Sequence, residues 1–349
     1  MVGPHRRSSN DGRPMRFARD MILPAALCAV TFAIALAMAI GAGVGGTKIV
    51  KSYATVSLFA TQLSFVLWAG IPWIRGAERK HLSPIEAALA LVKERWLIAL
   101  IPLAIFPIFM AGFTVAKVSF PYYTGYRWDG FWTAADALTF GRDPWQITHA
   151  LLGSWGSPIL TFAYTVLWGA AFALVLPLYC FSAKPRNAIR LYTAMMASWF
   201  LTGVVGASFF SSAGPIFAEL VDPVLGERFA PLHASLASLL PANDAVLISQ
   251  EYLRKAYQVP IAARGGGISA MPSMHLSVAM LLVIISWRTW LRPVAIGFWF
   301  LIWIGSIHTG YHYAWDGIIG SAIAALCWKA AAPRSRPFNI APQGQLAAA

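Results

Sequence analysis

The stretch SIHTGYHYAWDGIIG, residues 306–320, carries two histidines and an aspartate between two strongly apolar segments. These flanking segments, residues 293–310 and 314–331, have the length and composition of membrane-spanning helices. The polar stretch therefore predicts that the chain reaches one face of a membrane near Tyr311 and turns back at once. Ionisable side chains are costly inside a bilayer, so their presence at this turn indicates that they have partners and a purpose.

The composition of the whole chain indicates a membrane protein. Of the 349 residues, 58% are hydrophobic and only 12% are charged, which is too apolar for an ordinary soluble domain. The net charge of +13 does not indicate nucleic-acid binding, because the basic residues lie in short segments between apolar runs, where they set membrane orientation. Cys28, Cys180 and Cys327 all lie inside apolar runs and show neither a disulfide framework nor metal-binding spacing.

The hydropathy pattern predicts an all-α bundle of about eight transmembrane helices. They fall near 21–45, 53–74, 96–118, 158–181, 190–211, 273–291, 293–310 and 314–331. The segment 76–95 is predicted to be an amphipathic helix on the membrane surface. Most Lys and Arg residues then share one side with both termini, and the positive-inside rule makes that side cytoplasmic. The long loops 119–157 and 212–272 are expected on the exterior or periplasmic side of a cell membrane.

A second polar cluster precedes the sixth predicted span. His275 lies in ISAMPSMHLSV, residues 268–278, where Ser273 is a plausible N-cap of a helix. The free N–H groups and dipole of that helix start favour an anion. The glycines at 265–267 allow the backbone to approach a ligand closely, although a flexible loop is the commoner explanation of such a triplet. A hairpin of two roughly 19-residue helices, each about 28 Å long, brings His275 to the same membrane face as His312.

The spacing within the opening stretch pairs His312 with Asp316. Four residues apart, they lie on one face of a helix, within reach of a bond from a ring N–H to the carboxylate. Such a bond fixes the imidazole tautomer and leaves the other nitrogen free as nucleophile or base. A buried structural pair is the alternative. His308 is interpreted as lining the site or as structural, and His149 and His233 as ordinary polar residues of exterior loops.

Together, the two motifs resemble the type 2 phosphatidic acid phosphatase superfamily, over roughly residues 190–331. The residues that match its second and third motifs are Pro272, Ser273, His275, Gly310, His312 and Asp316. The resemblance implies metal-independent attack on a phosphate ester, without a cofactor. It implies that His312 is the nucleophile that forms a phosphohistidine, that Asp316 orients it, and that His275 protonates the leaving group. Water then accepts the phosphoryl group in a phosphatase, and a hydroxyl accepts it in a transferase.

The chain departs from the family pattern at the cations that clamp the phosphate. The family's first motif, a Lys followed after six residues by Arg-Pro, is absent, and SSAGPIF, residues 211–217, stands in its place. Ser306 stands where the third motif usually has Arg. The residues expected to bind substrate instead are Ser273, Arg264, Arg254, Lys255 and His308. The loss resembles the inositol-phosphotransferase branch, which includes fungal inositol phosphorylceramide synthase, and this favours a transferase slightly over a phosphatase.

The sequence thus predicts an integral-membrane lipid phosphatase or phosphotransferase that acts on a lipid phosphate or a phospholipid head group. The predicted parts are a cytoplasmic tail (1–20), an N-terminal transmembrane region with interfacial segments (21–185), a phosphatase-like catalytic core (186–332) and a flexible C-terminal tail (333–349). A proton-coupled transporter and a catalytically inactive scaffold are the alternatives.

The segment 119–157, outside the motifs, has two interpretations. Residues 119–157 are rich in Trp and Tyr, which is typical of a segment lying at a membrane interface. The same segment is also suited to form a lid or a groove for an acceptor lipid, to which Asp129, Asp136 or Arg142 would contribute.

Overall fold

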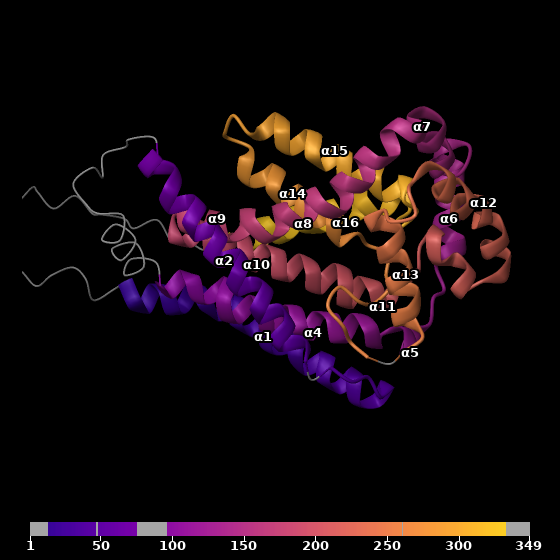
Figure 1. Ribbon diagram of the computed structural model, residues 1–349. Coiled ribbons are helices and arrows are strands. Elements are labelled where there is room, and N and C mark those ends of the chain that lie inside the picture. Colours follow the sequence, from indigo (N-terminus) through magenta and orange to yellow (C-terminus); the bar gives the residue numbers. More distant parts are fainter. Residues whose placement is uncertain (1–12, 47, 75–95, 260, 333–349) are drawn as a thin grey trace, which may run out of the picture.

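The computed structural model is all-helical, as the hydropathy pattern predicts (Figure 1). It describes residues 13–46, 48–74, 96–259 and 261–332. Within these ranges it contains helices, turns and irregular segments but no β-strand. The predicted surface helix at 76–95 and the tail at 333–349 lie outside the described residues.

The elements follow one another with short connections, and several form continuous longer helices. Up to residue 209 they are α1 (Arg13–Ala42), α2 (Ile49–Ile74), η1 (Ile101–Ile105), α4 (Phe106–Ser119), α5 (Pro121–Thr124), α6 (Asp129–Phe140), α7 (Pro144–Phe162), η2 (Ala163–Leu167), α8 (Trp168–Ala170), η3 (Ala171–Val175), α9 (Leu176–Ser182), α10 (Pro185–Phe200), η4 (Leu201–Gly206) and α11 (Ala207–Phe209). The remaining elements are η5 (Pro215–Leu220), α12 (Pro223–Leu239), α13 (Ala245–Tyr257), α14 (Met274–Ser286), α15 (Arg292–His308) and α16 (Ala314–Ala330).

Four helices of the described residues are long and apolar enough to cross a membrane. They cover 19–42, 96–124, 144–182 and 185–209. Many large apolar side chains on these helices and on α2 are exposed on the outside of the bundle, as expected for surfaces that face lipid. These features indicate a membrane protein. Helices also occupy the other predicted spans, as α2, α14, α15 and α16.

The sequence predicts a hairpin of two helices between His275 and His312, and the predicted length of the first of these helices is wrong. α14 has 13 residues, about 20 Å at 1.5 Å per residue, instead of roughly 19. It ends at Ser286, and residues 287–291 (Trp-Arg-Thr-Trp-Leu), which the prediction included in the span, form turns. A bilayer core about 30 Å thick needs about 20 helical residues. α14 therefore supplies only part of the sixth predicted span.

Close packing of α14 against α16 brings the two motifs together. The hydroxyl of Ser277 donates to the carbonyl oxygen of Gly320 at 2.9 Å, and a Cβ at Gly320 would overlap the carbonyl oxygen of Ser273. Only glycine permits this approach, because any side chain would separate the start of α14 from α16. The backbone N–H of Ser273 in turn donates to the carbonyl oxygen of Asp316 at 3.0 Å.

We expect Gly320→Ala to destabilise the protein by about 1–3 kcal/mol, because the added methyl overlaps backbone that cannot rotate away. Thermal unfolding of the purified protein measures the effect. Gly297→Ala on α15 is the matched control, because a Cβ at Gly297 meets no atom within 4 Å. Equal unfolding temperatures for the two variants would contradict the close packing.

The two segments that the sequence treats as exterior loops are largely helical. In Figure 1, α6, α12 and α13 gather at one end of the bundle, and together with η5 and the first turns of α7 we call them the cap. The cap has its own buried core, which includes Trp132, Trp145, Ile216, Phe217, Phe229, Leu232 and Tyr313. α7 continues from the cap into the bundle through a kink at Gly153, where φ is +53°.

Candidate active site

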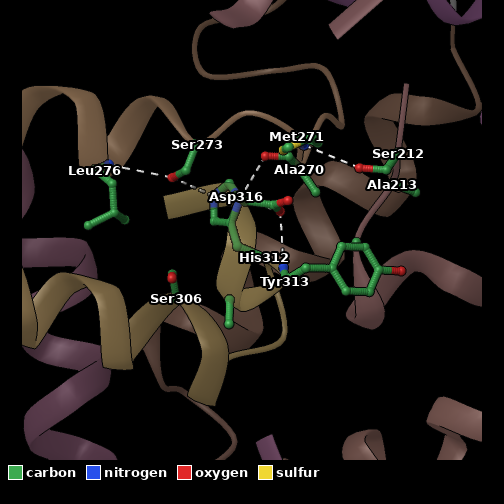
Figure 2. Close-up of polar contacts among 12 residues, drawn as sticks. Ser212, Ala213, Ala270, Met271, Ser273, Leu276, Ser306, His312, Tyr313 and Asp316 are labelled. Atoms are coloured by element: carbon green, nitrogen blue, oxygen red, sulfur yellow. Dashed lines mark hydrogen bonds and ion pairs between the residues drawn. The ribbon is translucent and has the colours of Figure 1, made fainter. Parts of the chain in front are cut away.

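His312 lies just before α16, with both ring nitrogens in defined contacts (Figure 2). Nδ1 lies 2.8 Å from the carbonyl oxygen of Ala270 and 3.2 Å from Oδ2 of Asp316. Both atoms are acceptors, so Nδ1 carries the proton and Nε2 holds a lone pair. Nε2 faces the hydroxyl of Ser273 at 3.3 Å. The predicted pairing of His312 with Asp316 is thus present in the structure.

The pair forms through a helix cap and not through a helix face. The sequence places both residues on one helix, but α16 begins at Ala314, and Tyr313 is its N-cap. Asp316 is the third residue of the helix, and its Oδ2 accepts the backbone N–H of Tyr313 at 3.0 Å. This is the carboxylate half of a capping box. Because the same oxygen contacts His312, the cap that starts α16 also positions the imidazole.

His275 lies one residue into α14 and close to His312. The two ring centroids are 6.0 Å apart. The His275 ring packs against Tyr164 and Trp168, with centroid distances of 4.7 and 4.2 Å, and the Trp168 indole N–H donates to the His275 carbonyl oxygen at 3.1 Å. Neither ring nitrogen has a hydrogen-bond partner among the described residues. The ring is therefore held by packing and leaves both nitrogens available.

Ser273 caps α14 as predicted. Its hydroxyl oxygen accepts the N–H of Leu276 at 3.4 Å, and its side chain is fully buried. The substitute for the family's first motif lies alongside: the carbonyl oxygen of Ser212 accepts the N–H of Ala270 at 2.9 Å. Ser306, where the family usually has Arg, is buried and accepts the His312 N–H on its carbonyl oxygen at 3.2 Å. Ser306 therefore supports the backbone and supplies no cation.

The remaining predicted substrate-binding residues do not all meet at this site. His308 is fully buried, and its two ring nitrogens bond the hydroxyls of Thr148 and Ser157 on α7, at 3.2 and 2.9 Å. Lys255 is mostly exposed and pairs with Glu251 at 3.2 Å.

The other two cations also differ in their contacts. Arg254 pairs with Glu219 at 2.7 Å. Arg264 lies in the glycine-rich loop, and its side chain forms no ion pair among the described residues. Of the predicted cations, Arg264 is thus the one with a free charge.

Two aspartates of α6 brace the site, and the sequence considered them only as part of a lid. The carboxylate of Asp129 accepts the N–H groups of Ala213 and Gly214, both at 2.9 Å, and the hydroxyl of Tyr313 at 3.0 Å. Asp136 accepts the N–H of Ala314 at 2.9 Å. The seven-residue spacing of the two aspartates, two helical turns, was the available signal. Their backbone partners are distant in sequence and could not be predicted.

Burial gives Asp136 an unusual proton affinity. It raises the pKa of Asp136 from 3.8 to about 7, although the N–H of Ala314 opposes the shift. Oδ1 is buried without a hydrogen-bond partner. A carboxyl whose pKa rises on folding stabilises the fold fully below the unfolded value, and this contribution is lost as the pH rises through the folded value.

We therefore expect the parent protein to lose stability as the pH rises from 4 to 7, and Asp136→Asn to keep its stability over this range. At pH 8 the variant should be more stable than the parent by about 2–4 kcal/mol, because asparagine keeps an acceptor for Ala314 without a buried charge. Near pH 4 the two should be similar. Thermal unfolding at both pH values measures this, with Asp222→Asn at the N-cap of α12, where asparagine can keep the cap, as a charge-matched control. A parent and variant with parallel pH profiles would contradict the argument.

The fold and the site together define a class of protein that is helical and membrane-embedded, with a histidine held in one tautomer close to a second histidine at a helix start. The sequence model of the PAP2 superfamily matches residues 138–330, more than half of the chain, and the chain belongs to this superfamily. Its members are generally phosphatases and phosphotransferases. The match begins within α6, ahead of residue 186, where the sequence placed the start of the core. No curated protein and no solved structure matches the chain.

Family membership and the apolar helices fit a membrane protein of the phosphatase type. They do not favour the proton-coupled transporter that the sequence left as an alternative.

Proposed function

We propose that the protein is an integral-membrane lipid phosphatase or phosphotransferase that works through a phosphohistidine at His312. The observation that carries the proposal is the state of the imidazole. Nδ1 is fixed as a donor by Ala270 and Asp316, and the Nε2 lone pair faces the start of α14. A nucleophile fixed in one tautomer beside an anion-binding helix start suits attack on a phosphate ester.

In the first step, the Nε2 lone pair of His312 attacks phosphorus and the bond from phosphorus to the leaving-group oxygen breaks. That oxygen takes a proton from His275, whose ring lies 6.0 Å from the His312 ring. The phosphohistidine ring is then cationic, and the Asp316 carboxylate stabilises it. The Leu276 N–H is taken by Ser273, but the N–H groups of Met274 and His275 have no acceptor within the helix, and they bind the non-bridging phosphate oxygens.

In the second step, His275 takes a proton from the acceptor hydroxyl, whose oxygen attacks phosphorus as the P–N bond breaks. Water as acceptor gives free phosphate, and an alcohol gives a new ester. The missing Arg at Ser306 and the absent first motif support the inositol-phosphotransferase branch, and hence a transferase. The residues that take part require no metal ion or cofactor.

The same proposal includes the placement in the cell. About eight spans, both termini in the cytoplasm and a site that faces the exterior or periplasm are supported by the distribution of basic residues. The substrate is then a lipid phosphate or a phospholipid head group in the outer leaflet of the cell membrane.

The test uses the full-length protein in nanodiscs with EDTA present. It is incubated with phosphatidic acid radiolabelled in the phosphate, and with phosphatidylinositol radiolabelled in the head-group phosphate, with and without diacylglycerol and ceramide. Release of inorganic phosphate identifies a phosphatase, and label in a new lipid identifies a transferase. An acid-labile, alkali-stable label on the protein marks the phosphohistidine. Absence of turnover and of protein labelling with every substrate would overturn the proposal.

A further inference from the structure

A cavity of about 390 Å³ opens beside His275. Its walls come from α2, from η1 and α4, from α8 to α10, and from the glycine-rich loop before α14. This volume lies within the range of cavities that hold small-molecule ligands. His312 does not line the cavity, but its ring centroid lies 6.0 Å from that of His275, which does.

The cavity holds two cations and no carboxylate. Lys117 at the end of α4 and Arg264 in the loop both line it, and no Asp or Glu is among the described residues of its lining. Within the described part of the chain, neither side chain has a hydrogen bond or an ion pair. Lys117 is only partly exposed. A lysine held without a counter-charge in a mostly apolar site favours an anionic ligand.

The glycine-rich loop is shaped around Lys117. Gly267 has φ of +87°, and a Cβ there would meet the backbone of Lys117 at 3.1 Å. The N–H of Gly265 donates to the hydroxyl of Tyr53 at 3.2 Å, and that hydroxyl bonds Thr114 at 2.7 Å. Gly267 therefore permits a close approach of the loop backbone to α4, a role that the sequence analysis did not consider. These contacts join the glycine-rich loop, α2 and α4 at the end of the cavity that carries Lys117 and Arg264.

Away from this end the walls are apolar. The lining residues of α4 and η1 run from Lys117 back to Pro102, 15 residues or about 22 Å of helix. Phe106, Phe113, Phe172 and Leu176 are among the side chains along this path. The cavity thus has one cationic end beside His275 and a long apolar body, which matches an amphiphile with an anionic head and a hydrocarbon chain.

We propose that this cavity is the substrate site, in which Lys117 binds the lipid phosphate beside His275 and the hydrocarbon chain lies along α4. Lys117 then supplies the positive charge that Ser306 and the altered first motif lack, with Arg264 at the mouth. The inference rests on the proposed function for the identity of the phosphate. It assigns that role to a helix outside the residues matched by the family, 138–330.

The test measures binding without turnover. Full-length His312→Ala protein in nanodiscs is titrated with radiolabelled hexadecyl phosphate, and retention on the immobilised protein is counted. Lys117→Met in this background should weaken retention about 10- to 100-fold, the value of a charge-assisted hydrogen bond, and Lys117→Arg should restore most of it. Lys51→Met, an exposed lysine of α2 that does not line the cavity, is the matched control and should change nothing.

Two further arms separate the head from the chain. Inorganic phosphate should compete only at much higher concentration than butyl, octyl and hexadecyl phosphates in that order, because the chain contributes to binding. In the active protein, Lys117→Met should raise KM more than it lowers kcat. The inference is overturned if the parent retains no alkyl phosphate, or if Lys117→Met binds as well as Lys51→Met. Neither result depends on turnover, so a failure here is distinct from a failure of the labelled-lipid assay.

Discussion

His312→Gln should lower turnover of a radiolabelled lipid phosphate by about 10⁴-fold or more, because the variant has no nucleophile for the covalent intermediate. Glutamine removes the nucleophile but can keep one hydrogen bond that the histidine makes. Its amide N–H can still donate towards the carbonyl oxygen of Ala270, which the Nδ1–H of His312 contacts at 2.8 Å. Label on the protein should vanish together with turnover. The measurement is the initial rate of the purified protein in nanodiscs.

The matched control is His233→Gln. His233 lies on α12, pairs with Glu219 at 3.4 Å and is remote from the catalytic motifs in sequence, so its replacement should leave turnover unchanged. Thermal unfolding of both variants shows whether the fold is retained. A folded His312→Gln protein with more than a tenth of the parent rate would exclude the phosphohistidine mechanism.

Asp316→Asn should lower the rate of phosphoenzyme formation by about 10²–10³-fold, since the cationic phosphohistidine loses its counter-charge. A larger loss is not expected. The asparagine oxygen can still accept the N–H of Tyr313, and the carbonyl oxygen of Ala270 still holds the proton on Nδ1 of His312. Tautomer and helix cap therefore survive, and only the charge is removed.

Single-turnover kinetics distinguish this role from a structural one. A merely structural Asp316 would lower the unfolding temperature and the amount of active protein, while each active molecule would form phosphoenzyme at the parent rate. Asp316→Glu keeps the charge but lengthens the side chain beside a buried ring, so it should recover part of the rate. An unchanged rate constant for Asp316→Asn would show that the carboxylate does not act on His312.

Local signals in the sequence predicted the helices and the meeting of the two motifs. Hydropathy identified the apolar runs, and Ser273 as an N-cap residue predicted the start of α14. The four-residue spacing predicted the pairing of His312 with Asp316. These features depend on neighbours within a few residues. The end of α14 was missed because the predicted span was carried on through Trp287, Trp290 and Leu291, which form turns together with Arg288 and Thr289.

The brace and the cavity could not be predicted, because both depend on contacts between distant segments. Asp129 meets backbone N–H groups some 84 residues away, and backbone N–H groups carry no sequence signature. Lys117 looked like an ordinary charge at a helix end. Only the fold places it in the cavity with His275 and shows that no carboxylate of the lining neutralises it.

The walls of the cavity include segments inside and outside the stretch that matches the superfamily. α2 and α4 lie before residue 138, whereas both histidines and Asp316 lie within the stretch that the superfamily shares. In the proposed lipid site, α2, η1 and α4 thus form the part of the wall that lies outside the stretch shared by the superfamily, and the rest of the wall lies within it. We therefore expect substitutions in α2 and α4 to change which lipid the proposed site accepts while the two histidine motifs stay unchanged.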